Sequence, residues 1–311
     1  WGLGNYRAFG LPSAVVQFSR GCPRKCSYCG QWDFWKRWRR RSIESFVEEI
    51  ESLSAQGIRL FWIADENWSV DRNLFINLLD SLKAVNRSHH LIVAMECAHV
   101  IRDVQEFKLY SEAGISMVML GLDNSDSNSV NPSEKKVEWK ELGEAIEALR
   151  RVGIISIVNR FTAHESRSFR DRNLKEISPD FYNFLYPTPH NWTRLGEEKR
   201  KFIVERDLTK WDYRHPVIGN SEADLILQRW RTKVREFHHN LSSAMIRAFV
   251  QRQSNPLTTK STSLVAGVYF LELWELIRDS TTYIAENVWN FLHDRWTQLW
   301  VGIRRAVKNH I

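Results

Sequence analysis

The sequence predicts an α/β protein that begins with a partial, TIM-like (β/α)6 barrel and continues into a helical C-terminal region. Three observations support this fold class. Short apolar runs alternate with longer amphipathic stretches in the N-terminal part of the chain. Glycines end several of the amphipathic stretches directly before the next apolar run. Polar residues then follow the apolar runs, where such a barrel would place its chemistry.

The expected elements alternate regularly along the chain. Short apolar runs predict strands at Ala14–Phe18, Ile58–Ala64, Leu91–Met95, Ile115–Gly121, Ile154–Val158 and Phe181–Tyr186. Amphipathic stretches predict helices at about Ile43–Gln56, Asp71–Asn86, Val100–Ala113, Trp139–Val152 and Glu165–Ile177. Gly57, Gly114 and Gly153 are placed as C-terminal caps. Strand–helix units in succession predict a parallel sheet with helical crossovers.

Polar groups gather where the strands are expected to end. The segment SRGCPRKCSYCGQ, residues 19–31, follows the first strand and carries Cys22, Cys26 and Cys29. The later strands are followed by Asp65, Glu66 and Asn67, by Cys97, and by Asp123 and Asn124. The carboxyl ends of parallel strands meet on one face, so these side chains are expected to form one site.

The pattern changes after about residue 190, which predicts a barrel over 1–190 and a helical, tryptophan-rich region over 191–311. Val265–Ile277 and Val288–Val307 have apolar positions at helical spacing. These helices are expected to pack on the barrel or on another subunit, with peripheral contact to a membrane surface as the alternative. No apolar run reaches the ~20 residues of a membrane span, so a cytoplasmic location is expected.

Charge alone leaves the partner open. The chain has 311 residues, 14 of them tryptophan, and a formal net charge of +7. Its densest basic run, from Lys36 to Arg41, is interleaved with aromatic residues and is either a solvated face or an anion clamp beside a cofactor. An RNA-modifying enzyme could use such a run to bind backbone and stack bases. We recognise no RNA-binding appendage, and no nucleic-acid partner is expected.

Three of the four cysteines lie at the spacing C-x-x-x-C-x-x-C. This clustering does not indicate a disulfide framework, and it favours a reducing compartment. A structural zinc site normally uses four protein ligands, and a second ligand pair is missing at the usual spacing. Three thiolates on a 4Fe–4S cluster would leave one iron open to a substrate or cofactor. The spacing therefore favours a cluster with an exchangeable fourth ligand.

The cysteine spacing after the first strand resembles the radical S-adenosylmethionine superfamily. Tyr28 also fits, because that family usually has an aromatic residue before the third cysteine. The resemblance implies a 4Fe–4S cluster on Cys22, Cys26 and Cys29, and S-adenosylmethionine as the fourth ligand. It also implies that an electron from the cluster releases a 5′-deoxyadenosyl radical, which removes hydrogen from an inert C–H bond.

The same resemblance implies further cofactor contacts. Glu66 stands where the superfamily holds the methionine amino group, and a carboxylate suits an ammonium ion. Asp123 or Asn124 stands where relatives contact the ribose or methionine moiety. Acidic loop residues also serve as solvated or helix-capping groups, which remains the alternative for both positions. No catalytic residue is assigned from the sequence.

A closer resemblance covers most of the chain. The segments VVQFSRGCPRKCSYCGQWDFWKRWRRRS, ADEN, LGLDN and YPTPHNWTRLGEEKRKFIVERDLTKWDYRHPVIG are similar to the anaerobic oxidative cyclases of magnesium-protoporphyrin IX monomethyl ester. That family is cobalamin-dependent and has an N-terminal cobalamin domain before the barrel. The chain begins at Trp1, where the barrel would begin, so we expect a longer protein with cobalamin bound mainly by a domain absent from this chain.

The closer resemblance implies a substrate and a reaction. The substrate would be a magnesium porphyrin, and closing its fifth ring would give protochlorophyllide for chlorophyll or bacteriochlorophyll synthesis, with electrons from an external donor. Trp192, Trp211 and Tyr213 lie in the family-like segment and suit a flat tetrapyrrole. His190 or His215 could bind the magnesium or serve as an acid–base group, although a lone histidine is more often structural.

The chain departs from the family pattern in three places along the sequence. Asp123 replaces a glutamate of the family, and Cys97 occupies a position where the family is not expected to have a cysteine. The segment VNRFTAHESRS places Arg160, Phe161 and Thr162 where the family usually has a glycine and an acidic turn. Bulkier side chains there could alter the adenosyl pocket. Two alternatives therefore stay open beside the cyclase: a cobalamin-dependent methyltransferase or other tetrapyrrole-modifying enzyme, and an iron–sulfur protein that binds a tetrapyrrole without turnover.

Overall fold

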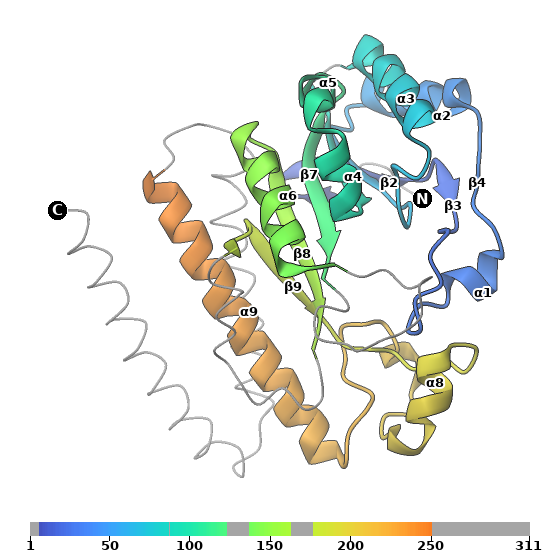
Figure 1. Ribbon diagram of the computed structural model, residues 1–311, viewed down its shortest axis with the longest axis vertical. Coiled ribbons are helices and arrows are strands. Elements are labelled where there is room, and N and C mark those ends of the chain that lie inside the picture. Colours follow the sequence, from blue (N-terminus) through green and yellow to red (C-terminus); the bar gives the residue numbers. More distant parts are fainter. Residues whose placement is uncertain (1–5, 87, 123–136, 163–176, 251–311) are drawn as a thin grey trace. The chain divides into compact units, whose positions relative to one another are not determined.

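The computed structural model describes residues 6–86, 88–122, 137–162 and 177–250 (Figure 1). The chain divides into two compact units, Trp1–Val265 and Ala266–Ile311, and the second lies wholly outside the described residues. The predicted helices at Val265–Ile277 and Val288–Val307 also lie outside the described residues. The boundary at residue 190 stays a prediction.

A single large sheet forms the centre of the first unit. Its strands, in spatial order, are β1 (Arg7–Ala8), β2 (Leu11–Val16), β5 (Leu60–Ile63), β6 (His90–Met95), β7 (Ile115–Gly121), β8 (Ile155–Phe161) and β9 (Phe181–Leu185). From β2 to β9 every neighbour is parallel and follows the chain order. This is the predicted partial barrel. The short β1 pairs antiparallel with β2 and was not predicted, because two residues are too few to show a periodicity.

Helices connect the parallel strands. They are α2 (Ile43–Ala55), α3 (Arg72–Val85), α4 (Cys97–Arg102), η1 (Val104–Glu106), α5 (Phe107–Glu112) and α6 (Trp139–Arg151). The Ser42 hydroxyl caps α2 by accepting from the Ser45 N–H, and the Asp71 carboxylate caps α3 by accepting from the Leu74 N–H. Gly57 has φ +92°, a conformation suited to glycine that turns the chain from α2 toward β5. The predicted helix at 165–177 lies almost wholly outside the described residues.

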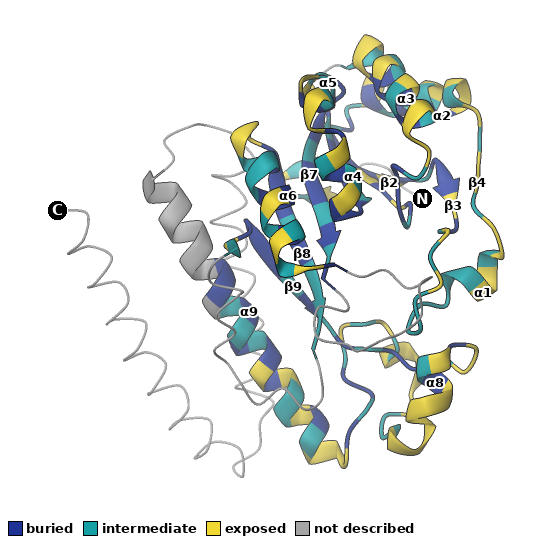
Figure 2. Cartoon of the chain, viewed as in Figure 1, coloured by how far each residue is buried: buried dark blue, intermediate teal, exposed yellow. Residues whose placement is uncertain are grey.

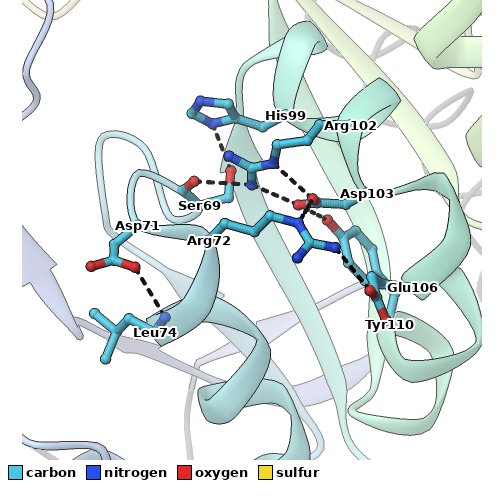
Figure 3. A network of polar contacts seen from close by, with 9 residues as sticks. All are labelled: Ser69, Asp71, Arg72, Leu74, His99, Arg102, Asp103, Glu106 and Tyr110. Carbon is cyan, nitrogen blue, oxygen red and sulfur yellow. Dashed lines mark hydrogen bonds and ion pairs between the residues drawn. The ribbon is translucent and has the colours of Figure 1, made fainter.

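The prediction of one continuous helix over Val100–Ala113 was wrong. The chain turns at Asp103, and its fully buried carboxylate accepts from Arg72, Arg102 and Tyr110 (Figure 3). Burial alone would raise the pKa of Asp103, but these hydrogen bonds and the Arg102 charge outweigh it and hold the pKa below its ordinary value. The amphipathic pattern cannot show this turn, because it depends on partners from α3 and α5.

Two apolar clusters position the carboxyl ends of the strands. The larger one fills the space between sheet and helices, with Phe46, Phe61 and Phe75 fully or almost fully buried. The smaller one takes one residue from each of five strands, near their amino ends: Leu60, Ile92, Met117, Ile155 and Phe181. This second cluster lies near the amino ends of the strands, and the polar side chains of the candidate site lie at their carboxyl ends.

The chain after β9 is mainly helical within the described residues. It contains α8 (Arg194–Lys199), η2 (Arg200–Phe202), η3 (Leu208–Lys210) and the long α9 (Glu222–Val250), which lies along β9 (Figures 1 and 2). The Asn240 side chain accepts from the Tyr182 N–H at 2.6 Å and donates to the Tyr182 carbonyl at 2.9 Å. Asn240 thus replaces a neighbouring strand at the edge of the sheet. Across the described residues, no helix is long and apolar enough to cross a membrane.

Candidate functional site

The cysteine loop, residues 21–30, joins a two-residue strand, β3 (Ser19–Arg20), to the short helix α1 (Gln31–Trp35). Cys22, Cys26 and Cys29 are all thiols of intermediate exposure. The Cys29 N–H donates to the Cys26 carbonyl at 3.0 Å, which folds the second half of the motif into a tight turn. The loop lies at the carboxyl end of β2, as the sequence predicts.

The environment of Cys29 disfavours its thiolate form unless a cationic group is bound nearby. Burial, with the nearby Cys26, Cys22 and Glu66, raises the pKa of Cys29 to about 11, so the thiolate form needs a compensating positive charge. In the part of the chain that is described, no three His, Cys, Asp or Glu side chains converge as the ligands of one ion do. A cluster does not require that convergence, because each thiolate binds a different iron.

Asp65, at the end of β5, fixes the entry to the cysteine loop. Its carboxylate accepts from the backbone N–H groups of Phe18 at 2.9 Å and Ser19 at 2.8 Å, and from the Ser19 hydroxyl at 2.5 Å. Burial raises the pKa of Asp65 to about 6 in spite of these donors. The residue therefore ties the start of the loop to the neighbouring strand.

Glu66 lies beside the cysteine loop, and its predicted contact with the cofactor stays a prediction. One carboxylate oxygen accepts from the Gly21 N–H at 3.0 Å, and the other accepts from the Trp35 indole N–H at 3.3 Å. Each oxygen of an ionised carboxylate has a second lone pair, so both can accept from a further donor. Glu66 is therefore fixed in orientation and still able to bind a cationic group.

Glu96 follows β6 directly and is buried, and it was not among the site residues predicted from the sequence. Its carboxylate accepts from the Arg24 guanidinium at 2.8 and 3.2 Å and from the Asn67 amide N–H at 2.7 Å. Arg24 lies between the first two cysteines, so this ion pair connects the cysteine loop to β6. A charged residue at the end of a predicted strand was the available signal. We call Arg24, Asp65, Glu66, Asn67 and Glu96 the charged cluster.

Cys97, which the sequence analysis singled out after the third strand, begins α4 and is fully buried in the larger apolar cluster. It faces the core between sheet and helices, whereas the neighbouring Glu96 contacts the cysteine loop. Asp123 and Asn124, the other predicted cofactor contacts, lie outside the described residues.

Aromatic rings cover another part of the cysteine loop. Tyr28 contacts Phe161 at a ring-centroid distance of 4.7 Å, and Phe161 contacts Tyr213 at 6.0 Å. His190 stacks on Trp192 at 4.8 Å with only 11° between the ring planes, and its ring lies 6.0 Å from that of Tyr213. Burial lowers the pKa of His190, which favours the neutral imidazole. We call these five residues the aromatic cluster.

Close backbone contacts hold the aromatic cluster to the loop. The Leu195 N–H donates to the Ser27 carbonyl at 3.0 Å. A Cβ atom at Gly30 would lie 2.4 Å from the Trp192 indole nitrogen, so only glycine leaves room for that ring. Trp211 adds its ring to that of His190 at 6.0 Å. The family-like segment after β9 thus reaches the cysteine loop.

The remaining predicted positions lie nearby in different roles. The Arg160 guanidinium lies over the Trp139 ring at 5.2 Å, and the Thr162 hydroxyl donates to the Leu185 carbonyl at 3.2 Å. The His215 imidazole pairs with the Asp212 carboxylate at 3.0 Å. Of the two candidate histidines, His190 is the one whose ring contacts within the aromatic cluster are observed among the described residues.

The sequence profile of the Radical SAM superfamily matches residues 16–172. The anaerobic magnesium-protoporphyrin IX monomethyl ester cyclase of Synechocystis is 36% identical over 217 residues, which cover 68% of this chain and 44% of that protein. The hopanoid C-3 methylase of Methylococcus capsulatus is 24% identical over 67% of this chain and 40% of that protein. The chain thus spans less than half the length of these two curated relatives.

A solved structure shares the fold. The radical S-adenosylmethionine methyltransferase TsrM from Kitasatospora setae, solved with cobalamin and a 4Fe–4S cluster bound, superposes with a TM-score of 0.54. It is 19% identical, and the match covers 62% of this chain and 37% of that one. The likeness supports the same fold, a partial barrel.

Proposed function

Because the chain belongs to the radical S-adenosylmethionine superfamily, we propose that it is the barrel of an enzyme that oxidatively closes a ring on a magnesium porphyrin methyl ester. The observation that carries the substrate class is the 36% identity, over 217 residues, to a cyclase named for that ester. Protochlorophyllide would be the product, and the reaction would serve chlorophyll or bacteriochlorophyll synthesis.

Cys22, Cys26 and Cys29 would hold the 4Fe–4S cluster. When bound, the cluster and S-adenosylmethionine supply the one-electron chemistry needed to oxidise an inert carbon–hydrogen bond. The chain contributes a fixed loop for the thiolates: Asp65 holds its start, and the Arg24–Glu96 pair holds its middle. These contacts support the assignment, because they fix the loop that carries the three cysteines.

Glu66 would bind the ammonium group of the methionine moiety. Its contacts with Gly21 and Trp35 aim the carboxylate at the cysteine loop and leave lone pairs for a cation. Asp123 and Asn124 remain proposed contacts to the same cofactor from the end of β7.

The aromatic cluster would bind the flat face of the tetrapyrrole. Large rings offer extensive apolar contact area and stack on π systems. His190 stands among these rings, and burial lowers its pKa, which keeps a nitrogen lone pair available to magnesium. The cluster contacts the cysteine loop through Ser27, Tyr28 and Gly30, so a bound ring would lie near the reactive cofactor.

Cobalamin would be a third cofactor. The structural neighbour TsrM was solved with cobalamin, and the curated relatives extend well beyond the matched region. We place the main cobalamin-binding domain outside these 311 residues.

The test begins with S-adenosylmethionine alone. The chain is reconstituted anaerobically with iron and sulfide, reduced with dithionite and given S-adenosylmethionine, and 5′-deoxyadenosine is measured by mass spectrometry. We expect the nucleoside from the wild type and from Cys97→Ala, and its absence from Cys26→Ala. If the wild-type chain assembles its cluster but forms no nucleoside, the proposed enzyme is refuted. The remaining interpretation is then a protein that binds a tetrapyrrole without turnover.

Adding magnesium-protoporphyrin monomethyl ester and cobalamin then tests the substrate. Ring closure on the ester supports the cyclase. Methyl transfer is the second candidate, and it is favoured by a specific observation: one relative is named a methylase, and the structural neighbour is a methyltransferase. A product that has gained a methyl group without a new ring would decide for that reaction.

A further inference from the structure

A dense basic surface lies beside the cysteine loop and has no role in the proposed chemistry. It is carried by β3, by the segment around α1, and by β4 (Arg39–Arg40). We call it the basic patch, and its exposed members are Arg20, Lys25, Lys36, Arg37, Arg39 and Arg40. Within the described residues only Lys36 of these six forms an ion pair, with Asp33 at 3.7 Å. Most of the positive charge of the patch is therefore not neutralised by ion pairs among the described residues and can attract an anionic partner.

The patch is held in a fixed shape. Residues 19 and 20 of β3 pair antiparallel with β4, which places Arg20 opposite Arg39. The two guanidinium groups lie over the ring of Trp35, at 5.2 and 4.9 Å from its centroid. The Trp38 indole N–H donates to the Ser19 hydroxyl at 3.1 Å. Such order lowers the entropic cost of binding a partner.

The patch also touches the cysteine loop directly. Gly21, the residue before Cys22, has φ +86°, and a Cβ atom there would lie 2.6 Å from the Arg37 carbonyl oxygen. Trp35, which supports Arg20 and Arg39, donates its indole N–H to Glu66. A macromolecule bound to the patch would therefore lie next to the cluster ligands and the proposed cofactor carboxylate.

We infer that the basic patch is the docking surface for an acidic electron-donor protein. This inference rests on the proposed function, because that chemistry consumes an electron from outside. One electron would leave the reduced donor, which is oxidised, and enter the cluster, which is reduced; docking itself forms and breaks no covalent bond. Redox encounters use small interfaces, and opposite charges steer them.

The way the aromatic residues are held favours a protein partner over a membrane surface. The indole nitrogens of Trp35 and Trp38 are hydrogen-bonded within the fold, and the Trp32 ring lies under the Lys25 ammonium at 4.3 Å. Phe34, 70% exposed, is the apolar side chain of this region that most clearly faces solvent. Insertion into lipid needs a broader apolar face than this.

The experiment separates docking from chemistry by changing the reductant. Variant A carries Lys36→Glu, Arg37→Glu and Arg40→Glu. Control variant B carries the same charge reversal on distant helices, at Lys108, Lys140 and Arg151, whose side chains are at least 76% exposed. The rate of 5′-deoxyadenosine formation is measured for the reconstituted wild type and both variants. Each protein is assayed once with dithionite and once with a reduced, acidic flavodoxin as the probe.

With flavodoxin, we expect the rate of variant A to fall by about tenfold or more, because charge steering typically changes association rates by that order. With dithionite, variant A should stay within about twofold of the wild type, since no partner has to dock. Variant B should match the wild type with both reductants. The flavodoxin-driven rate of the wild type should fall with added salt, and that of variant A should respond much less.

The outcomes distinguish the two proposals. An equal loss of flavodoxin-driven rate in variants A and B, or no loss in variant A, would overturn the docking surface. So would loss of binding to phosphatidylglycerol vesicles in variant A without any loss of flavodoxin-driven rate, because the patch would then be a membrane surface. Absence of the nucleoside with dithionite in the wild type would refute the proposed function instead. Flavodoxin binding by light scattering, present in the wild type and lost only in variant A, would still test the docking surface.

Discussion

The charged cluster and the aromatic cluster both contact the cysteine loop, but different forces hold them. In the charged cluster, Asp65 and Glu96 are buried and each accepts several hydrogen bonds from neighbouring elements. In the aromatic cluster, half-exposed rings touch at centroid distances of 4.7 to 6.0 Å, and backbone contacts fix only the segment that carries them. One side of the site is therefore set by directional bonds, and the other by ring packing.

This difference indicates two kinds of ligand. Burying a carboxylate costs desolvation energy, which hydrogen bonds and ion pairs have to offset. A charged cluster held by such directional bonds suits a cofactor that must always bind in one orientation. Rings that contact one another by packing can shift to fit a large flat molecule and gain affinity from the area they cover. Apart from Arg24 and Tyr28, which belong to the cysteine loop itself, the charged cluster lies at the ends of β5 and β6, and the aromatic cluster lies on β8 and the segment after β9.

Removing Glu96 is the largest expected disturbance. Glu96→Ala leaves Arg24 and Asn67 without their shared partner, and the buried position should make this cost about 3 kcal/mol of unfolding free energy, less than a fully buried pair because Arg24 is partly exposed. The matched control is Glu112→Ala, which breaks a solvent-exposed ion pair with Lys83 and should lower the unfolding free energy much less than Glu96→Ala. Urea unfolding measures both.

The Glu96 variant should also bind less iron per chain after reconstitution, because the cysteine loop loses its link to β6. Equal stability of the two variants would show that the charged cluster is not the rigid side of the site. Normal iron content in Glu96→Ala would show that the Arg24–Glu96 pair does not organise the loop.

Asp65 gives the charged cluster a pH dependence of known sign. Burial raises its folded pKa to about 6, above the ordinary value of about 3.9, so the folded state binds the proton more tightly. Its contribution to stability is therefore fully present below pH ~4 and is lost as the pH rises through ~6, by roughly 3 kcal/mol in total. Asp65→Asn lacks this ionisation. The unfolding free energy of the wild type minus that of the variant should decrease from pH 4.5 to 7.5.

Urea titrations of both proteins at several pH values measure this difference. An increase with pH would mean that the three donors from Phe18 and Ser19 stabilise the carboxylate more than burial destabilises it. The charged cluster would then be built for a permanent negative charge beside the loop.

Much of the architecture could be predicted because it follows local patterns. Strand periodicity identified the six parallel strands, and their order placed the cysteine loop and Glu66 on one face. The break at Asp103 could not be predicted, because partners distant in sequence cause it. Glu96 was missed for a similar reason: its importance comes from Arg24, which lies 72 positions away. The spatial link between Gly30 and Trp192 likewise depends on tertiary contact.

A smaller effect is expected at the sheet edge that supports the aromatic cluster. Asn240→Ala removes two hydrogen bonds to the buried Tyr182 backbone and should cost about 2 kcal/mol, since buried backbone groups lose their partners. Asn220→Ala, which loses only the exposed side-chain hydrogen bond to the Asp224 carboxylate at 3.4 Å, should change stability by less than about 0.5 kcal/mol. Urea unfolding compares the two. Equal costs would mean that another group covers the edge of β9 when Asn240 is absent.

The smallest expected effect is local. It tests whether ring packing against Trp192 lowers the pKa of the His190 imidazole. Burial lowers the pKa of this imidazole, and Trp192 covers one of its faces. Trp192→Ala should therefore raise the pKa of His190 toward its ordinary value, because water regains access to the charged form. Titration of the imidazole C–H signals by NMR measures this change, with Trp62→Ala, an exposed tryptophan on β5, as the matched control. An unchanged pKa would assign the shielding to Trp211 and Tyr213 instead, and would make those rings the fixed part of the aromatic cluster.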